Sequence, residues 1–325
     1  MSNGVEQNLS SMKLSELSIP NLQRSASLAY YTTMRVGGPA DALVVAETAD
    51  ELAGIVTELW KTDFPFMILG GGSNVLVSDA GIHGVVVINR TRPGEGFRFT
   101  EAETLDAEPP TVWVDAGVNF GALTRQAALR GLSGLEWASG IPGTVGGAVI
   151  GNAGAHGSDM AGTLVVAEIL HPFQGRQLWP VERLEYRYRS SVLKGKPAPQ
   201  PQAIVLSATL RLTRSTEEAV QAKMNVIAEK RRRIQPPGAS MGSMFRNPPG
   251  DYAGRLIEAA GLKGTCVGGA EISSRHANFF INHGDATAAD IQALIMIAQK
   301  AVADMFGVKL ELEIILVGDF PDLAP

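Results

Sequence analysis

The segment Ser139–Gly157 constrains the fold more than any other part of this 325-residue chain. It reads SGIPGTVGGAVIGNAGAHG, with seven glycines, several alanines and almost no bulky side chain. Side chains this small cannot fill a hydrophobic core, so something large is expected to approach the backbone closely. Two interpretations stay open: a glycine-rich crossover packed against another segment of the chain, and a surface for a flat cofactor.

The first glycine run along the chain is Ile68–Asp79 (ILGGGSNVLVSD), which follows a β-α-β pattern, and Ser139–Gly157 is the second. DALVVAE predicts a strand, a helix follows from a capping box of Thr48 and Glu51, and FPFMILG returns as a buried strand. The run lacks both the G-x-G-x-x-G of dinucleotide folds and the lysine of a P-loop. Consecutive glycines let backbone N–H groups surround an anion, so a pyrophosphate cradle competes with a tight turn between strands.

The rest of the chain mixes strand and helix patterns. A helix is expected over 120–130, closed by Gly131, among the strands GVVVIN, TVWVDAG, TLVVAEILH and AIVLSATLRL. After Arg214 the pattern becomes mainly helical, and the final apolar alternation over 308–318 predicts a strand. Further helices are expected over 215–233, 253–261 and 287–307. The chain is therefore expected to fold as an α+β protein.

Charge and cysteine content narrow the class of function. The formal net charge of −5 argues against a nucleic-acid partner and favours small-molecule chemistry. A single cysteine, Cys266, allows no internal disulfide and fits a reducing compartment, so we expect a cytoplasmic protein. Neither a secretory signal nor a membrane helix is apparent, and the histidines show no metal-binding spacing, so no membrane partner and no metal are expected. The sequence leaves the oligomeric state open, and a monomer is compatible with it.

Ordered motifs give the chain a specific resemblance. YTTMRVGGPA, GGGSNVLV, GIPGTVGGAVIGNAGAHG, YRSS, GSMFRNP, AGRLIEAAGLKG and LELEIILVG cover nearly everything after Leu28. Together they resemble the UDP-N-acetylenolpyruvoylglucosamine reductase family in its shorter subtype. The resemblance implies an FAD-binding module of the vanillyl-alcohol-oxidase type in two subdomains, followed by a C-terminal α+β substrate-binding domain. The implied boundaries are 1–26 for a flexible leader, 27–91 and 92–214 for the FAD subdomains, and 215–325 for the substrate domain.

The resemblance also implies a reaction. The family reduces UDP-N-acetylglucosamine enolpyruvate to UDP-N-acetylmuramate for peptidoglycan synthesis, with non-covalent FAD as cofactor and NADPH as co-substrate in two alternating steps. Two other functions stay open: an FAD-dependent alcohol oxidase of the same fold, and a nucleotide-sugar-binding module that has lost its cofactor.

Three residues match the family's catalytic positions. Ser243 would donate a proton, Arg189 would contact carboxylate oxygens, and Glu313, kept protonated, would donate a hydrogen bond. Without the resemblance they would be interpreted as a turn residue, a surface cation and part of a strand's polar face. His156 occupies a position where the family often has Tyr, and we assign it no role. The resemblance places Tyr188, Arg233 and Asn247 beside the substrate, and Arg35, Gly70, Gly71, Gly72, Ser73, Asn74, Ile141, Pro142, Gly143, Thr144, Gly146, Gly147, Asn152, Gly154 and Ala155 beside FAD.

Overall fold

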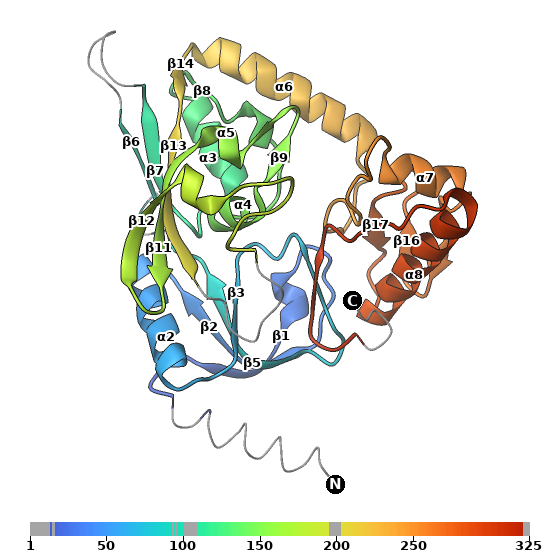
Figure 1. Cartoon of the computed structure of the whole chain (residues 1–325), viewed down its shortest axis with the longest axis horizontal. Helices are drawn as coiled ribbons and strands as arrows, with labels where there is room; N and C mark the ends of the chain where they lie inside the picture. Colours follow the sequence, from blue (N-terminus) through green and yellow to red (C-terminus); the bar gives the residue numbers. More distant parts are fainter. Residues whose placement is uncertain are drawn as a thin grey trace. The chain divides into compact units, whose positions relative to one another are not determined.

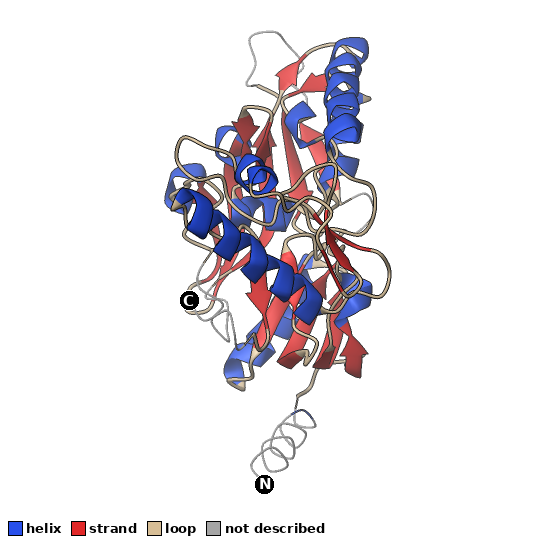
Figure 2. Ribbon diagram, turned by 90° about the vertical axis from the view of Figure 1, so that its right-hand side faces the viewer, coloured by secondary structure: helices blue, strands red, loops and turns tan. Residues whose placement is uncertain are grey.

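The computed structural model describes residues 14, 17–92, 94, 96–100, 109–194 and 203–320. Contacts divide the chain into two compact units that interleave along the sequence. The described residues contain both helices and mainly antiparallel strands, which confirms the α+β class (Figure 2). The three domains implied by the resemblance remain a prediction. Unit 1 comprises residues 1–24, 42–70 and 84–229, and unit 2 comprises residues 25–41, 71–83 and 230–325.

The β-α-β pattern before the first glycine run is confirmed. Helix α2 (Ala49–Lys61) begins at the predicted capping box, in which Thr48 and Glu51 each accept a backbone N–H of the other residue. Its buried face carries Leu52, Ile55, Val56 and Leu59, as helical spacing predicts. The neighbouring sheet has the order β1-β2-β5-β3, with bounds Gln23–Ser27, Pro39–Ala46, Ile82–Asn89 and Phe66–Leu69.

Apolar side chains that precede β1 also belong to unit 1. Leu14, Leu17 and Ile19 are buried in the same hydrophobic cluster as the inner face of α2. This part of the predicted leader therefore contributes to a core.

A five-stranded antiparallel sheet forms the centre of unit 1. Helices α3 (Phe120–Ala128), α4 (Val145–Gly151) and α5 (Met160–Thr163) lie together beside it (Figure 1). Alternate side chains of the strands, such as Val112 and Val114, are buried in the core of this unit. The strand order is β12-β11-β13-β7-β6, with bounds Gly175–Pro180, Leu164–His171, Ile204–Arg211, Thr111–Asp115 and Phe97–Thr100.

The glycine-rich run forms more structure than its sequence predicted. Its middle part is helix α4, and Val145, Ala148 and Val149 are buried in the core. The expectation that the run cannot fill a core is therefore wrong for α4, because helical spacing gathers its few apolar side chains on one face. At Gly146 the close approach is to another segment of the chain: its N–H donates to the Ala116 carbonyl at 2.8 Å. A Cβ there would lie 2.9 Å from the Ala116 Cβ.

Unit 2 combines late and early parts of the sequence. Met34, Val36 and Leu76 are buried in one cluster with the apolar face of α8 (Ala288–Phe306). The carboxylate of Asp79 accepts the N–H groups of Ala288 and Ala289, at 2.8 and 2.9 Å, and so ties the end of the first glycine segment to the start of α8. The other elements are α7 (Ala253–Ala259), the antiparallel strands β15 (Cys266–Val267), β16 (Ala270–Ile272) and β17 (Phe280–Asn282), and the parallel pair β4 (Val75–Val77) and β18 (Ile315–Val317).

The predicted C-terminal strand is much shorter than expected. Only Ile315–Val317 forms a strand, whereas the alternation had predicted one over 308–318. The preceding residues pair one at a time with the segment around Met244, through the isolated bridge of Phe245 and Leu312. An alternating pattern predicts which side chains share a face but does not predict a continuous ladder. None of the described helices is long and apolar enough to cross a membrane.

Polar residues cross the five-stranded sheet of unit 1 in a row. The Trp113 indole N–H donates to Ser207 Oγ at 3.1 Å, and that hydroxyl donates to Glu168 Oε2 at 3.1 Å. Asp115, opposite Ser207 in the strand register, is 1% exposed, and its Oδ2 has no hydrogen-bond partner among the described residues. Burial raises the pKa of Asp115 to about 6; the Arg98 guanidinium opposes this shift and the Glu168 carboxylate adds to it.

Replacing Asp115 with asparagine should stabilise the protein more at pH 8 than at pH 5. A carboxyl whose pKa is raised on folding favours the folded state below its unfolded value of about 4 and loses that contribution as pH rises through about 6. The uncharged amide should therefore raise the free energy of unfolding by about 2 kcal/mol at pH 8, with a smaller gain at pH 5. Thermal unfolding of both proteins at the two pH values measures this. Equal gains at both would contradict it.

Candidate active site

The first glycine run lies at a close approach of two backbone segments in unit 2. Gly72 has φ +59°, and a Cβ there would lie 2.0 Å from the Tyr31 carbonyl oxygen. Its own carbonyl accepts the Thr33 N–H at 3.0 Å. Two residues further, Asn74 Nδ2 donates to the Glu313 carbonyl at 3.2 Å, and the Asn74 carbonyl accepts the Ile315 N–H at 2.9 Å. The turn thus joins the predicted cofactor loop to the strand that follows Glu313.

The second glycine run leaves part of its backbone accessible in unit 1. Pro142 and Gly147 are exposed, and Ile141, Gly143 and Thr144 are half-buried. Thr144 accepts the Gly147 N–H as the N-cap of α4, and a Cβ at Gly70 would lie 2.5 Å from its Oγ1. An accessible backbone with few side chains is the surface that a flat cofactor requires. These residues therefore fit FAD.

Arg189 occupies an unusual backbone conformation in unit 1. It lies in a tight turn whose ends, Arg187 and Ser190, exchange two backbone hydrogen bonds of 3.0 and 3.1 Å. Its φ is +55°, in the region where glycine is usual. Its guanidinium donates from Nη2 to the Gly154 carbonyl at 2.7 Å and lies 5.0 Å from the centre of the Tyr188 ring. The turn therefore connects the predicted cationic residue to the end of the glycine-rich run.

Ser243 and Glu313 lie on paired segments of unit 2. Ser243 bridges to Phe279, and the carbonyl of the next residue, Met244, accepts the Glu313 N–H at 2.9 Å. Asn278 holds the same segment, because its side chain accepts the Phe245 N–H at 2.9 Å and donates to the Phe245 carbonyl at 2.8 Å. Both Ser243 and Glu313 are half-buried. The structure therefore places two of the three predicted catalytic residues on neighbouring backbone segments.

The other predicted residues are distributed over both units. Tyr188 is 53% exposed beside Arg189. Asn247 is exposed, and its side chain accepts the Ala253 N–H at the start of α7. Arg233 lies in the last turn of α6 (Glu217–Ile234), where Arg275 donates to the carbonyls of Arg232 and Gln235 at 3.1 Å. Arg35 is exposed in a turn with φ +58°.

Two side chains that hold segments of the predicted site in place were not predicted from the sequence. Lys194 Nζ donates to the Arg189 carbonyl at 2.9 Å, and Asp79 caps α8. The only sequence signals were a lysine five positions after Arg189 and an acidic residue two positions after an apolar strand. Neither signal identifies its partner. Among the described residues, no group of three or more His, Cys, Asp or Glu side chains is arranged to hold a metal ion.

Two family models match the chain. The FAD binding domain matches residues 40–170, and the C-terminal domain of UDP-N-acetylenolpyruvoylglucosamine reductase matches residues 235–317. The first contains the glycine-rich run with its accessible backbone, and the second contains Ser243 and Glu313. The chain therefore contains an FAD-binding module, as the sequence predicted.

Proteins of nearly the same length as this chain are similar to it over almost their whole sequence. The UDP-N-acetylenolpyruvoylglucosamine reductase of Chloroflexus aggregans is 44% identical over 293 residues, which are 90% of this chain and 96% of that protein. The enzyme of Bacillus subtilis is 38% identical over 307 residues, 94% of this chain and 97% of its own. The crystal structure of the Thermus caldophilus reductase superposes with a TM-score of 0.74 at 37% identity, covering 92% of this chain and 99% of that one. This chain therefore belongs to the UDP-N-acetylenolpyruvoylglucosamine reductase family.

Proposed function

We propose that this protein reduces UDP-N-acetylenolpyruvoylglucosamine to UDP-N-acetylmuramate, with FAD as cofactor and NADPH as reductant. The observation that carries the proposal is the pairing of the backbone segments that contain Ser243 and Glu313, through Met244 and Glu313, in a region that matches the family's C-terminal model. The alternative, an alcohol oxidase, gives no reason for a hydroxyl at position 243. The single cysteine, Cys266, agrees with a reducing compartment, and we propose the cytoplasm as the location.

Bound FAD would supply the hydride chemistry, taking a hydride from NADPH and delivering one to the terminal carbon of the enolpyruvyl double bond. The glycine-rich run Ile141–Ala155 and the turn Gly70–Asn74 would hold the cofactor through backbone contacts. No side chain is assigned a covalent link to it.

The protein's own task is to stabilise negative charge on the enolpyruvyl group and to protonate it. Hydride addition places charge on the neighbouring carbon and its carboxylate, which a fixed cation and hydrogen-bond donors stabilise. Arg189 is the cation in this proposal, since a guanidinium can form two parallel bonds to a carboxylate. Ser243 transfers its hydroxyl proton to the charged carbon, and a protonated Glu313 donates to the developing charge. Arg233 and Asn247 bind the nucleotide-sugar part.

An absorbance spectrum tests the proposal. The purified protein should be yellow, NADPH should bleach the flavin band, and UDP-N-acetylenolpyruvoylglucosamine should restore it without oxygen. A flavin that NADPH does not bleach would contradict the proposal. Recovery that requires oxygen and an alcohol, with no response to the enolpyruvyl compound, would support the oxidase instead.

A further inference from the structure

We propose that Lys194 is a positioning residue for the reaction, which acts by holding Arg189 in its strained turn. The inference rests on the proposed function, because it gives Arg189 the role described above.

The turn has a residue type that its geometry disfavours. The Arg187 carbonyl accepts the Ser190 N–H at 3.1 Å, so Tyr188 and Arg189 are the two central residues. Arg189 has a positive φ of +55° and Tyr188 does not, which is the pattern of a type II turn. Glycine or asparagine usually occupies the second central position, since a side chain there is strained. A strained backbone at a non-glycine residue motivates the hypothesis that its side chain has a role.

The residues around the turn anchor it to the end of α4. Tyr186 donates its hydroxyl to the Val149 carbonyl at 2.8 Å, and Ser191 donates to the Ile150 carbonyl at 2.7 Å. These carbonyls belong to the last turn of the helix, where no intrahelical partner remains. Burial, with a smaller contribution from the Asp159 charge, raises the pKa of Tyr186, so its phenol keeps the proton that it donates.

Two further contacts act on the turn itself. Asn152 Nδ2 donates to the Arg187 carbonyl at 3.0 Å. Arg189 Nη2 donates to the Gly154 carbonyl at 2.7 Å, and a Cβ at Gly154 would lie 3.2 Å from Nη1 of the same guanidinium. The same Cβ would lie 2.7 Å from the Asp159 Cβ and 2.8 Å from the Ser158 carbonyl oxygen, so glycine at 154 mainly allows the close approach of this neighbouring segment.

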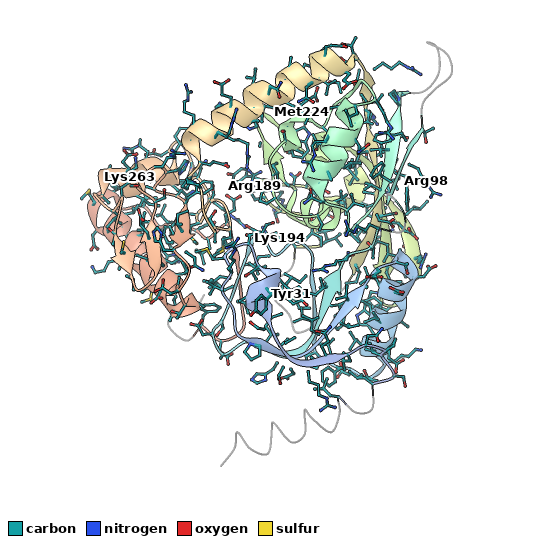
Figure 3. The ribbon with its side chains drawn as sticks, turned by 180° about the vertical axis from the view of Figure 1, so that it is seen from behind. Tyr31, Arg98, Arg189, Lys194, Met224 and Lys263 are labelled. Carbon is teal, nitrogen blue, oxygen red and sulfur yellow. The ribbon has the colours of Figure 1, made fainter. Side chains whose placement is uncertain are left out.

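Lys194 supplies the contact to the strained residue. Its Nζ donates to the Arg189 carbonyl at 2.9 Å, from a position five residues along the chain (Figure 3). A charged donor makes a stronger hydrogen bond than a neutral one, and the orientation of this carbonyl depends on the peptide plane that follows Arg189. Removing the ammonium should let the turn relax to an unstrained conformation and move the guanidinium. A displacement of about 1 Å at a reacting group can cost about 100-fold in rate.

The change Lys194→Ala should slow reoxidation of the reduced flavin by the enolpyruvyl substrate by about 10- to 100-fold. Reduction by NADPH should not change, because neither Arg189 nor Lys194 has a part in that half-reaction. In an Arg189→Ala background, Lys194→Ala should cause no further loss, since the lysine acts through the arginine. Lys194→Arg, which keeps a charged donor, should stay within about threefold of the original rate. Lys300→Ala, at an exposed residue of α8, is the surface control.

Tryptic cleavage after Arg187 and Arg189 gives a measurement that does not depend on activity. A relaxed turn should be cut faster in Lys194→Ala than in the original protein, and Lys194→Arg should not differ from it. Unchanged cleavage, or an equal further loss of rate in the Arg189→Ala background, would overturn the inference. A flavin that the enolpyruvyl compound never reoxidises would reject the proposed function instead, and the cleavage result would still decide whether Lys194 holds the turn.

Discussion

Replacing Ser243 with alanine should slow reoxidation of the reduced flavin by the enolpyruvyl substrate by about 100- to 1,000-fold, while reduction by NADPH proceeds at its original rate. The loss follows from the removal of the hydroxyl that transfers a proton to the charged carbon, a contribution of the size typical for a positioned acid. Stopped-flow absorbance measures the two half-reactions separately.

The backbone around Ser243 makes this substitution a clean test. The segment is held by the bridge to Phe279, by the Met244 carbonyl and by the side chain of Asn278, so losing one hydroxyl should leave its course unchanged. Ser274→Ala, at an exposed serine of the same unit, is a matched control and should change neither half-reaction. If the Ser243 variant is reoxidised at the original rate, the hydroxyl is not the proton donor.

The parts of the fold that were predicted from sequence are those with local causes. The capping box at Thr48 and the face of α2 need only a few consecutive residues, and both are confirmed. The cap of α8 by Asp79 joins residues 209 positions apart, so no local pattern could predict it. The short β18 has the same explanation: Glu313 bonds to Met244 rather than to a neighbouring ladder, and this pairing depends on the tertiary fold.

The candidate site, like the fold, could be predicted only in part from the sequence. The resemblance identified Arg189, Ser243 and Glu313, whereas their residue types alone favoured ordinary surface roles. The structure adds the reasons for their local geometry, namely the strained turn at Arg189 and the paired segments at Ser243 and Glu313. Lys194 could not be recognised from the sequence, because a lysine in a polar loop predicts a solvated charge.

Gly72 should be among the least replaceable residues of the chain, and Gly72→Ala should abolish stable folding or cost more than about 4 kcal/mol. The new Cβ would lie 2.0 Å from the Tyr31 carbonyl oxygen and 2.8 Å from the Thr32 Cα, both backbone atoms that no rotamer change can move. The opposing segment cannot shift freely either: Met34 is fully buried, and its carbonyl accepts Asn282 Nδ2 at 2.9 Å. Soluble yield and thermal unfolding of the purified variant measure the loss.

A second glycine separates steric overlap from backbone strain. Gly307, at the C-cap of α8, has φ +67°, close to the +59° of Gly72, but a Cβ there would meet no atom within 4 Å. Gly307→Ala should therefore cost only about 1 kcal/mol, the usual penalty for a side chain in the left-handed region. Similar losses of stability for the two variants would mean that a Cβ at position 72 has more room beside the Tyr31 carbonyl than the 2.0 Å distance indicates. A Gly72→Ala protein that folds normally but lacks FAD would instead assign this glycine to the cofactor rather than to the packing of unit 2.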